Sequence, residues 1–175
     1  IYIYYPFNFK NLFLSRDFAS YFGDLKELTS SPIVNIHLKF DKDIAGVLPN
    51  DFAGMLSTIS QWVFKVTDYQ VCVVISSAAA VAEKTKEEIA KLAESELKMC
   101  FPCLKGFNVT SARVLKEMRA TFVPDKASLN SRPGTKTSVS NLLLAGDWTD
   151  TGLPATIEGA VKSGKTAANE ILKLN

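Results

Sequence analysis

The chain has 175 residues, of which 47% are hydrophobic, and its formal net charge at pH 7 is +2. This length allows one good core or two smaller ones, and the composition excludes a disordered acidic or strongly basic tail. Lysines and arginines are interleaved with aspartates and glutamates, so no surface for nucleic acid is predicted. No apolar run approaches the roughly 18 residues that a membrane-spanning helix needs.

The first 22 residues are crowded with aromatic side chains, from Tyr2 to Phe22. This segment either packs on sequence outside this chain, or lines an apolar tunnel or a membrane-facing surface. Residues 33–40 then alternate with period two, which predicts a strand with Val34, Ile36, Leu38 and Phe40 on one face. His37 lies on the other face without an evident triad partner, so it is a poor catalytic candidate.

The middle of the chain is predicted to complete a sheet with one packed helix. Residues 41–60 contain several turn residues and are expected to form a loop with at most one helical turn. Strands are expected at 61–66 and 70–75, joined by a turn at 67–69. Trp62 is expected in the core, with a place in a substrate wall as the alternative. Residues 78–99 have the pattern of an amphipathic helix that ends before Pro102.

Three cysteines do not form a disulfide framework in a chain of this length. Cys100 and Cys103 have the CxxC spacing of zinc and redox sites, but zinc needs four ligands, and only Cys72 and His37 remain as candidates. A thioredoxin-like pair belongs at the start of a helix, whereas this pair follows a predicted helix. No metal site is therefore predicted.

The last part of the chain has the pattern most suggestive of a ligand site. Residues 107–122 are expected to be extended and 126–137 to form a surface loop. Residues 142–145 are a short apolar run, typical of a buried strand, which Gly146 and Asp147 end. A turn-rich loop follows at 148–154. A helical pattern begins at Ala155, and its apolar face comprises Ile157, Ala160, Val161, Gly164, Ala168, Ile171 and Leu172.

A strand that turns into a helix N-terminus can hold an anionic or dipolar ligand, because the first N–H groups of the helix are unpaired and the helix dipole is positive there. The carboxylate of Asp147 only accepts hydrogen bonds, so it suits ligand hydroxyls better than phosphates. The alternative is an ordinary structural unit in which Gly146 and Asp147 serve only the turn.

The run LLLAGDWTDTGLPATIEGAVKSGKTAA resembles the C-terminal flavin-binding segment of the FAD-dependent amine oxidase and phytoene desaturase superfamily. Together with SPIVNIHLKF and QWVFK, it is most similar to the hydroxysqualene dehydroxylase branch. The resemblance implies that Asp147 binds the ribityl and pyrophosphate region of FAD, and that the backbone at 155–157 faces the pyrimidine end of the flavin. The cofactor-binding residues that it implies are Gly146, Asp147, Trp148, Pro154, Ala155, Thr156 and Ile157.

The expected fold combines α+β and α/β parts. Residues 1–120 are expected to form a substrate-binding portion, with a mixed or antiparallel sheet and a packed helix. Residues 121–175 are expected to close a Rossmann-like FAD domain with a strand, a turn and a helix. The Gly-x-Gly-x-x-Gly fingerprint of such a domain is absent. We therefore expect a C-terminal portion of a longer protein, whose missing N-terminal FAD-binding part is its partner, and weak or no FAD binding by this chain alone.

Thr156 stands where amine oxidases commonly place an aromatic side chain, which favours an isoprenoid over an amine as the substrate implied by the resemblance. We expect an FAD-dependent oxidoreductase that acts on an apolar isoprenoid, in the cytoplasm and in peripheral contact with the inner membrane face. The alternatives are a flavin amine oxidase and a non-catalytic ligand-binding or interaction module. No Gly-x-Ser-x-Gly elbow supports hydrolysis, and no catalytic residue is assigned.

Overall fold

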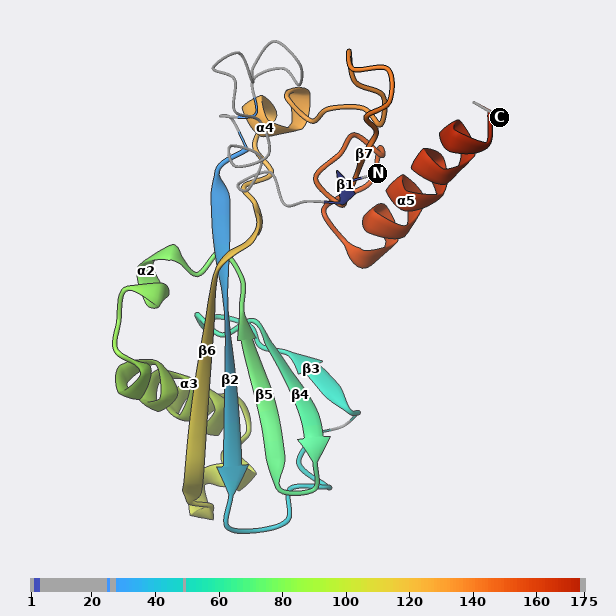
Figure 1. The fold of residues 1–175 in the computed structure, drawn as a ribbon. Coiled ribbons are helices and arrows are strands. Elements are labelled where there is room, and N and C mark those ends of the chain that lie inside the picture. The colour runs from blue at the N-terminus through green and yellow to red at the C-terminus, as the bar shows by residue number, and fades with distance from the viewer. Residues whose placement is uncertain (1, 4–24, 26–27, 49, 174–175) are drawn as a thin grey trace. The chain divides into compact units, whose positions relative to one another are not determined.

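The computed structural model describes residues 2–3, 25, 28–48 and 50–173. The chain forms two compact units (Figure 1). One is Ser31–Ala120, and the other combines the described residues of 1–30 with those of 121–175. The chain enters the first unit through β2 (Ser30–Phe40) and leaves it through β6 (Val109–Phe122). Most of the aromatic segment 1–22 lies outside the described residues.

The grouping of residues 1–30 differs from the division expected from the sequence, which placed them with residues 31–120. In the structure, β1 (Tyr2–Ile3) pairs in parallel with β7 (Leu144–Ala145), so the start of the chain belongs with its last quarter. The functions assigned to the two portions stay predictions.

The first unit contains a five-stranded sheet with the strand order β3-β4-β5-β2-β6. The strands β3 (Phe52–Gly54), β4 (Trp62–Thr67) and β5 (Gln70–Ile75) pair antiparallel along the sheet, and β5 pairs antiparallel with β2. Asp41 N donates to Asn108 O at 3.0 Å, next to the C-terminal end of β2 and the N-terminal end of β6, so these two strands also run antiparallel. The strands predicted at 33–40, 61–66 and 70–75 are thus confirmed.

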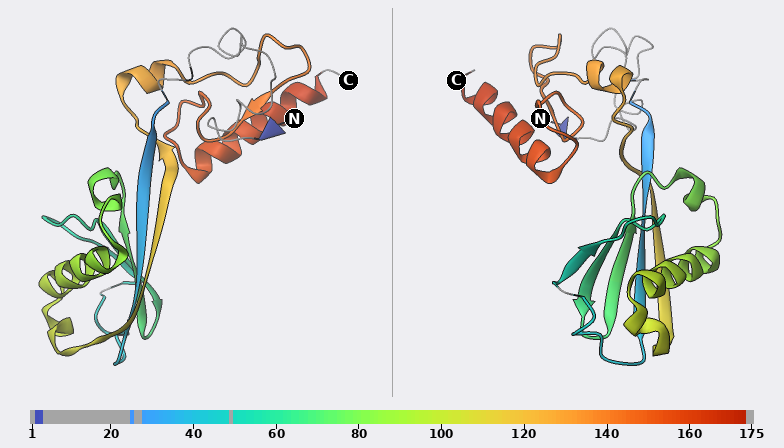
Figure 2. Two further views of the ribbon diagram at one scale, coloured as in Figure 1. Left: turned by 60° about the vertical axis from the view of Figure 1, so that its left-hand side comes forward. Right: turned by 180° about the vertical axis from the view of Figure 1, so that it is seen from behind.

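The core of this unit lies between the sheet and one helix. The predicted alternation in β2 is correct, because Val34, Ile36 and Leu38 are fully buried. Their face packs against α3 (Lys86–Cys100), which Figure 2 shows running across one side of the sheet. Each buried aliphatic side chain of this kind contributes about 1.5–3 kcal/mol. No described helix of this unit covers the opposite face, which is called the open face below.

The single helix predicted over 78–99 is wrong. Two helices form instead, α2 (Ala79–Ala82) and α3, because Thr85 is extended and starts a new helix. Its hydroxyl accepts from Glu88 N at 3.2 Å, and the Glu88 carboxylate accepts from Thr85 N at 2.8 Å. This reciprocal capping box satisfies two backbone donors and separates the helices. The short helix η3 (Pro102–Gly106) follows α3.

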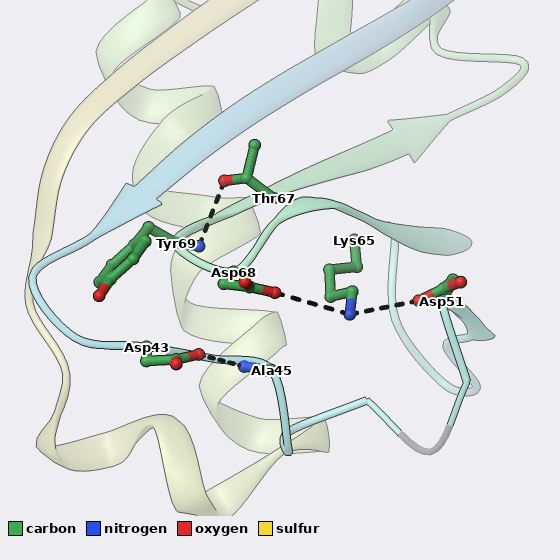
Figure 3. Close-up of polar contacts among 7 residues, drawn as sticks. All are labelled: Asp43, Ala45, Asp51, Lys65, Thr67, Asp68 and Tyr69. Carbon is green, nitrogen blue, oxygen red and sulfur yellow. Dashed lines mark hydrogen bonds and ion pairs between the residues drawn. The ribbon is translucent and has the colours of Figure 1, made fainter.

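The loop predicted over 41–60 contains a strand, β3, because Phe52 and Gly54 pair with residues of β4. Close to this pairing, the ammonium of Lys65 lies 3.3 Å from the carboxylate of Asp51 and 3.8 Å from that of Asp68 (Figure 3). Exposed ion pairs of this type contribute about 1 kcal/mol or less each, so they support the turn without determining the fold.

In the second unit, Leu28, Phe122, Leu142, Leu144 and Trp148 form the core. The apolar run 142–145 is buried as predicted, but only its last two residues, β7, form a strand. The loop predicted over 126–137 begins with a helix, α4 (Lys126–Asn130), because the Asp125 carboxylate caps it by accepting from Ser128 N at 2.8 Å.

The final helix, α5 (Ile157–Leu172), begins two residues later than expected and packs on a different face. Its buried positions are the small residues Gly159, Ser163 and Ala167, whereas Ile157 is 87% and Val161 52% exposed. The predicted apolar face of α5 is therefore not the face that packs within this unit. The neighbouring loop lies so close to the helix that only small side chains fit between them. No helix in the described part of the chain is long and apolar enough to cross a membrane.

Candidate functional site

The turn after β7 requires glycine at position 146. Gly146 has φ +154°, a conformation that other residues rarely adopt. A Cβ atom built there would lie 2.6 Å from Cδ1 of Trp148 and collide with its Nε1. The side chain of Trp148 is 3% exposed and belongs to the core. Gly146 therefore lets the chain turn tightly while Trp148 anchors the following loop.

A buried pair of hydroxyl groups connects this turn to α5. Thr149 Oγ1 donates to Gly146 O at 2.8 Å and lies 2.7 Å from Ser163 Oγ of α5. Because the Thr149 proton is used, Ser163 donates to Thr149, and it accepts from Gly146 N at 3.0 Å. These bonds fix the start of the loop against the helix.

The guanidinium of Arg132 holds the remainder of the loop 147–153. It donates to the carbonyl oxygens of Leu153 at 2.7 Å and Asp147 at 2.9 Å, more weakly to that of Trp148 at 3.4 Å, and to that of Thr149. A planar guanidinium carries five N–H donors in a fixed geometry, so one side chain can bind several carbonyls at once.

Partial burial lowers the pKa of Arg132, while the carboxylates of Asp150 and Asp147 act in the opposite direction. The side chain remains charged because an arginine pKa is far above neutral. The guanidinium carbon also lies 5.5 Å from the centre of the Phe122 ring. Nothing in the sequence pattern distinguished Arg132 from the other arginines of the chain, and its role is visible only in the folded loop.

The start of α5 is capped and lies at the surface. Thr156 is the N-cap residue, and its hydroxyl accepts from Gly159 N at 3.2 Å. A Cβ atom on Gly159 would lie 2.8 Å from Pro154 O, so glycine allows the loop to approach the helix. Glu158 in the first turn is favourable for the helix dipole.

The seven residues predicted to bind a cofactor differ in their exposure and in their contacts. Gly146 and Asp147 are half-buried, and the Asp147 carboxylate makes no hydrogen bond or ion pair to any described residue. Trp148 can contribute only its backbone, because its side chain is in the core. Pro154, Thr156 and Ile157 are exposed and Ala155 is partly buried. The arrangement presents one carboxylate and the N-terminus of a 16-residue helix.

A second feature lies in the other unit, on the open face of its sheet. Phe52, Trp62 and Phe64 are 53%, 44% and 39% exposed, and their ring centres lie 6.1–6.3 Å apart. We call these three residues the aromatic ladder. The expectation that Trp62 is a core residue is wrong, because its side chain lies on the face of the sheet opposite α3, which no helix in the described part of this unit covers. Among the described residues, no group of His, Cys, Asp and Glu side chains could hold a metal ion.

Comparison with known proteins identifies the family. The model of the family described as "Flavin containing amine oxidoreductase" matches residues 14–172. The chain belongs to this family. It is 39% identical over 119 residues to a hydroxysqualene dehydroxylase of Rhodopseudomonas palustris, which covers 68% of this chain and 28% of that protein. A hydroxysqualene dehydroxylase of Sinorhizobium fredii is 34% identical over 139 residues, with 78% and 31% covered.

Phytoene desaturases are more distant relatives. The 15-cis-phytoene desaturase of Solanum lycopersicum is 25% identical over 185 residues, covering 96% of this chain and 32% of that protein. This chain spans about a third of the length of the relatives it matches. Among solved structures, a putative protoporphyrinogen oxidase from Exiguobacterium is similar over 89% of this chain and 38% of that one, with a TM-score of 0.61 and 13% identity. That likeness supports the shared fold.

Proposed function

We propose that this chain is the C-terminal portion of an FAD-dependent oxidoreductase that acts on an isoprenoid lipid, in the manner of a hydroxysqualene dehydroxylase or a phytoene desaturase. The observation that carries the proposal is the 34–39% identity to hydroxysqualene dehydroxylases, compared with 25% to a phytoene desaturase. Membership of a flavin-containing family supports the same class of chemistry.

The residues of the second unit fit the flavin side of FAD. The free carboxylate of Asp147 can accept hydrogen bonds from hydroxyls of the ribityl chain, and the exposed N-terminus of α5 can face the pyrimidine end of the flavin. A helix N-terminus stabilises negative charge by about 0.3–1 kcal/mol, and by up to about 2 kcal/mol when partly buried. FAD itself would supply the redox chemistry, while these residues orient it.

The remaining FAD contacts are proposed to come from another part of the same protein. In this proposal, β7, the turn at Gly146 and α5 close a Rossmann-like domain whose Gly-x-Gly-x-x-Gly unit lies outside this chain. Most contacts to the ADP half of FAD would then be absent from residues 1–175, which supports the expectation that this chain alone binds FAD weakly or not at all.

The first unit is proposed to hold the substrate. The aromatic ladder exposes three rings on one face of the sheet, an arrangement suited to a long apolar chain. Thr156 at the helix start likewise supplies no aromatic ring beside the flavin. An isoprenoid of this kind partitions into bilayers, so we propose that the whole enzyme works in peripheral contact with a membrane.

The test incubates the full-length protein with hydroxysqualene, phytoene and a panel of primary amines and polyamines, and follows both flavin reduction and products. Turnover of an isoprenoid without turnover of amines is expected. Turnover of an amine with release of peroxide, and of neither isoprenoid, would refute the proposal.

A matched pair of variants tests the substrate wall. Trp62→Ser should raise the KM for the isoprenoid by about tenfold with little change in kcat, because apolar wall contacts bind substrate and transition state alike. Leu129→Ser is the control, since Leu129 is similarly exposed but lies in α4 of the other unit. Equal effects of the two substitutions would exclude a substrate role for the ladder.

A further inference from the structure

The open face of the sheet changes in character from one side to the other. Strand register places Phe64 beside Cys72 and Cys72 beside His37, while Lys39 pairs with Gln70. The aromatic ladder thus occupies the β3–β4 side of this face, and polar and basic residues occupy the β2–β6 side. There, a cleft of about 290 Å³ is lined by His37, Lys39, Gln70, Ser111, Arg113 and Leu115.

The polar lining of the cleft consists mainly of hydrogen-bond donors. Gln70 Nε2 lies 3.1 Å from His37 Nδ1, and because an amide nitrogen only donates, the neutral imidazole carries its proton on Nε2. Lys39 and Arg113 add an ammonium and a guanidinium, and Ser111 adds a hydroxyl. None of the described residues that line the cleft is acidic.

The two basic side chains of the cleft have no counter-charge among the residues that the structure describes. Neither the Lys39 nor the Arg113 side chain forms an ion pair or hydrogen bond with any described residue. Glu117, further along β6, accepts from Arg119 N at 3.1 Å. Burial raises the pKa of the neighbouring Cys72 thiol, which therefore stays neutral. Two like charges at one cleft repel each other, and a bound anion would remove that repulsion.

We propose that this cleft binds a phosphate-type anion, either a free phosphate or diphosphate or the phosphate of a lipid headgroup. Arg113 can bind two phosphate oxygens in bidentate fashion, and Lys39 acts as a point charge beside it. His37 Nε2–H and the Ser111 hydroxyl can donate to the remaining oxygens. The aromatic ladder on the same face is positioned for an apolar tail when the anion belongs to a lipid. The proposal does not depend on the flavin chemistry.

The test compares three forms of the full 175-residue chain. The double variant K39Q/R113Q removes both cations of the cleft. The control K162Q/K165Q makes the same change in net charge with two exposed lysines of α5, which belongs to the other unit. All substituted side chains are exposed, so circular dichroism should show the same fold for each form.

Two probes distinguish the sources of the anion. Sodium diphosphate is titrated by calorimetry at low ionic strength, and flotation measures binding to vesicles of phosphatidylcholine with and without phosphatidylglycerol. K39Q/R113Q should weaken binding by about tenfold or more relative to both wild type and K162Q/K165Q, since charge-assisted bonds are lost. If the loss occurs with diphosphate alone, the ligand is a soluble anion. If it occurs with phosphatidylglycerol vesicles alone, the ligand is a lipid headgroup. Equal losses in both double variants, or no binding of either probe by the wild type, would overturn the proposal.

Discussion

Replacing Arg132 with glutamine should destabilise the second unit without removing any apolar side chain from its core. Arg132 makes well-formed bonds to the carbonyls of Leu153 and Asp147, at 2.7 and 2.9 Å, and also binds those of Trp148 and Thr149. A hydrogen bond from a charged group contributes about 1.5–3 kcal/mol. Since the guanidinium is only partly buried and water can reach some of the freed carbonyls, the summed loss should be about 2–4 kcal/mol rather than the full sum.

The two tryptophans allow this loss to be measured in one unit at a time. Trp62→Phe leaves Trp148, which is buried in the second unit, as the single fluorescent tryptophan. In this background, Arg132→Gln should lower the urea midpoint of Trp148 fluorescence by about 1–2 M, given typical urea slopes. Arg132→Lys should recover little, because one ammonium cannot satisfy carbonyls spread from 147 to 153.

Arg113→Gln is the matched control, because it removes the same charge from an exposed side chain in the other unit. Its effect on the Trp148 transition should be close to zero. If Arg132→Gln shifts the midpoint no more than Arg113→Gln does, the carbonyl contacts of Arg132 do not stabilise the loop.

Three further changes test separate parts of the structure. Gly146→Ala should destabilise the second unit by about 1–3 kcal/mol, because alanine is strained at this φ and its Cβ collides with Trp148. An unchanged urea midpoint of Trp148 fluorescence would show that this turn does not require glycine. Ser163→Ala should cost about 1–3 kcal/mol in the same assay, because Gly146 N and the buried Thr149 lose a partner; a neutral result would show that these groups find other partners. Hydrogen bonds from the backbone and side chain of Thr85 lower the pKa of Glu88, so this group adds stability at neutral pH that is lost as the pH falls through the glutamate range. In acid titrations followed by circular dichroism, Glu88→Gln should therefore lose less stability than wild type. Equal losses would show that the Glu88 carboxylate does not stabilise the start of α3 through the capping box.

Much of the first unit follows from local patterns. The alternation of Val34, Ile36 and Leu38 correctly predicts the buried face of β2, because α3 packs on that face. The break between α2 and α3 was also present in the sequence as the capping-box pattern from Thr85 to Glu88, which the continuous helical periodicity obscured. The exposure of Trp62 could not be predicted, because residue type indicates burial only when the covering layer is known.

The parts of the site that depend on neighbouring residues could be predicted from the sequence, whereas those that depend on contacts between distant residues could not. Gly146 and Asp147 are conspicuous at the end of an apolar run, whereas the contacts of Arg132 span 15–21 residues of irregular loop. In α5, hydrophobic periodicity identifies the stripe of Ile157 and Val161 but not the stripe of small residues that packs within this unit.

We propose that the turn at 146–147 binds FAD, and retention of the cofactor by the full-length protein is the measurement that bears on this proposal without intermediate assumptions. Asp147→Ala should lose a hydrogen bond to a charged acceptor, weakening FAD binding by about 1.5–3 kcal/mol, or tenfold or more. Asp150→Ala is the control, an exposed carboxylate in the same loop. Visible absorbance of the purified proteins should show depleted flavin for Asp147→Ala alone, with the melting temperature of the apoprotein unchanged. Full flavin occupancy in Asp147→Ala together with a lowered melting temperature would show instead that Asp147 is only a structural turn residue.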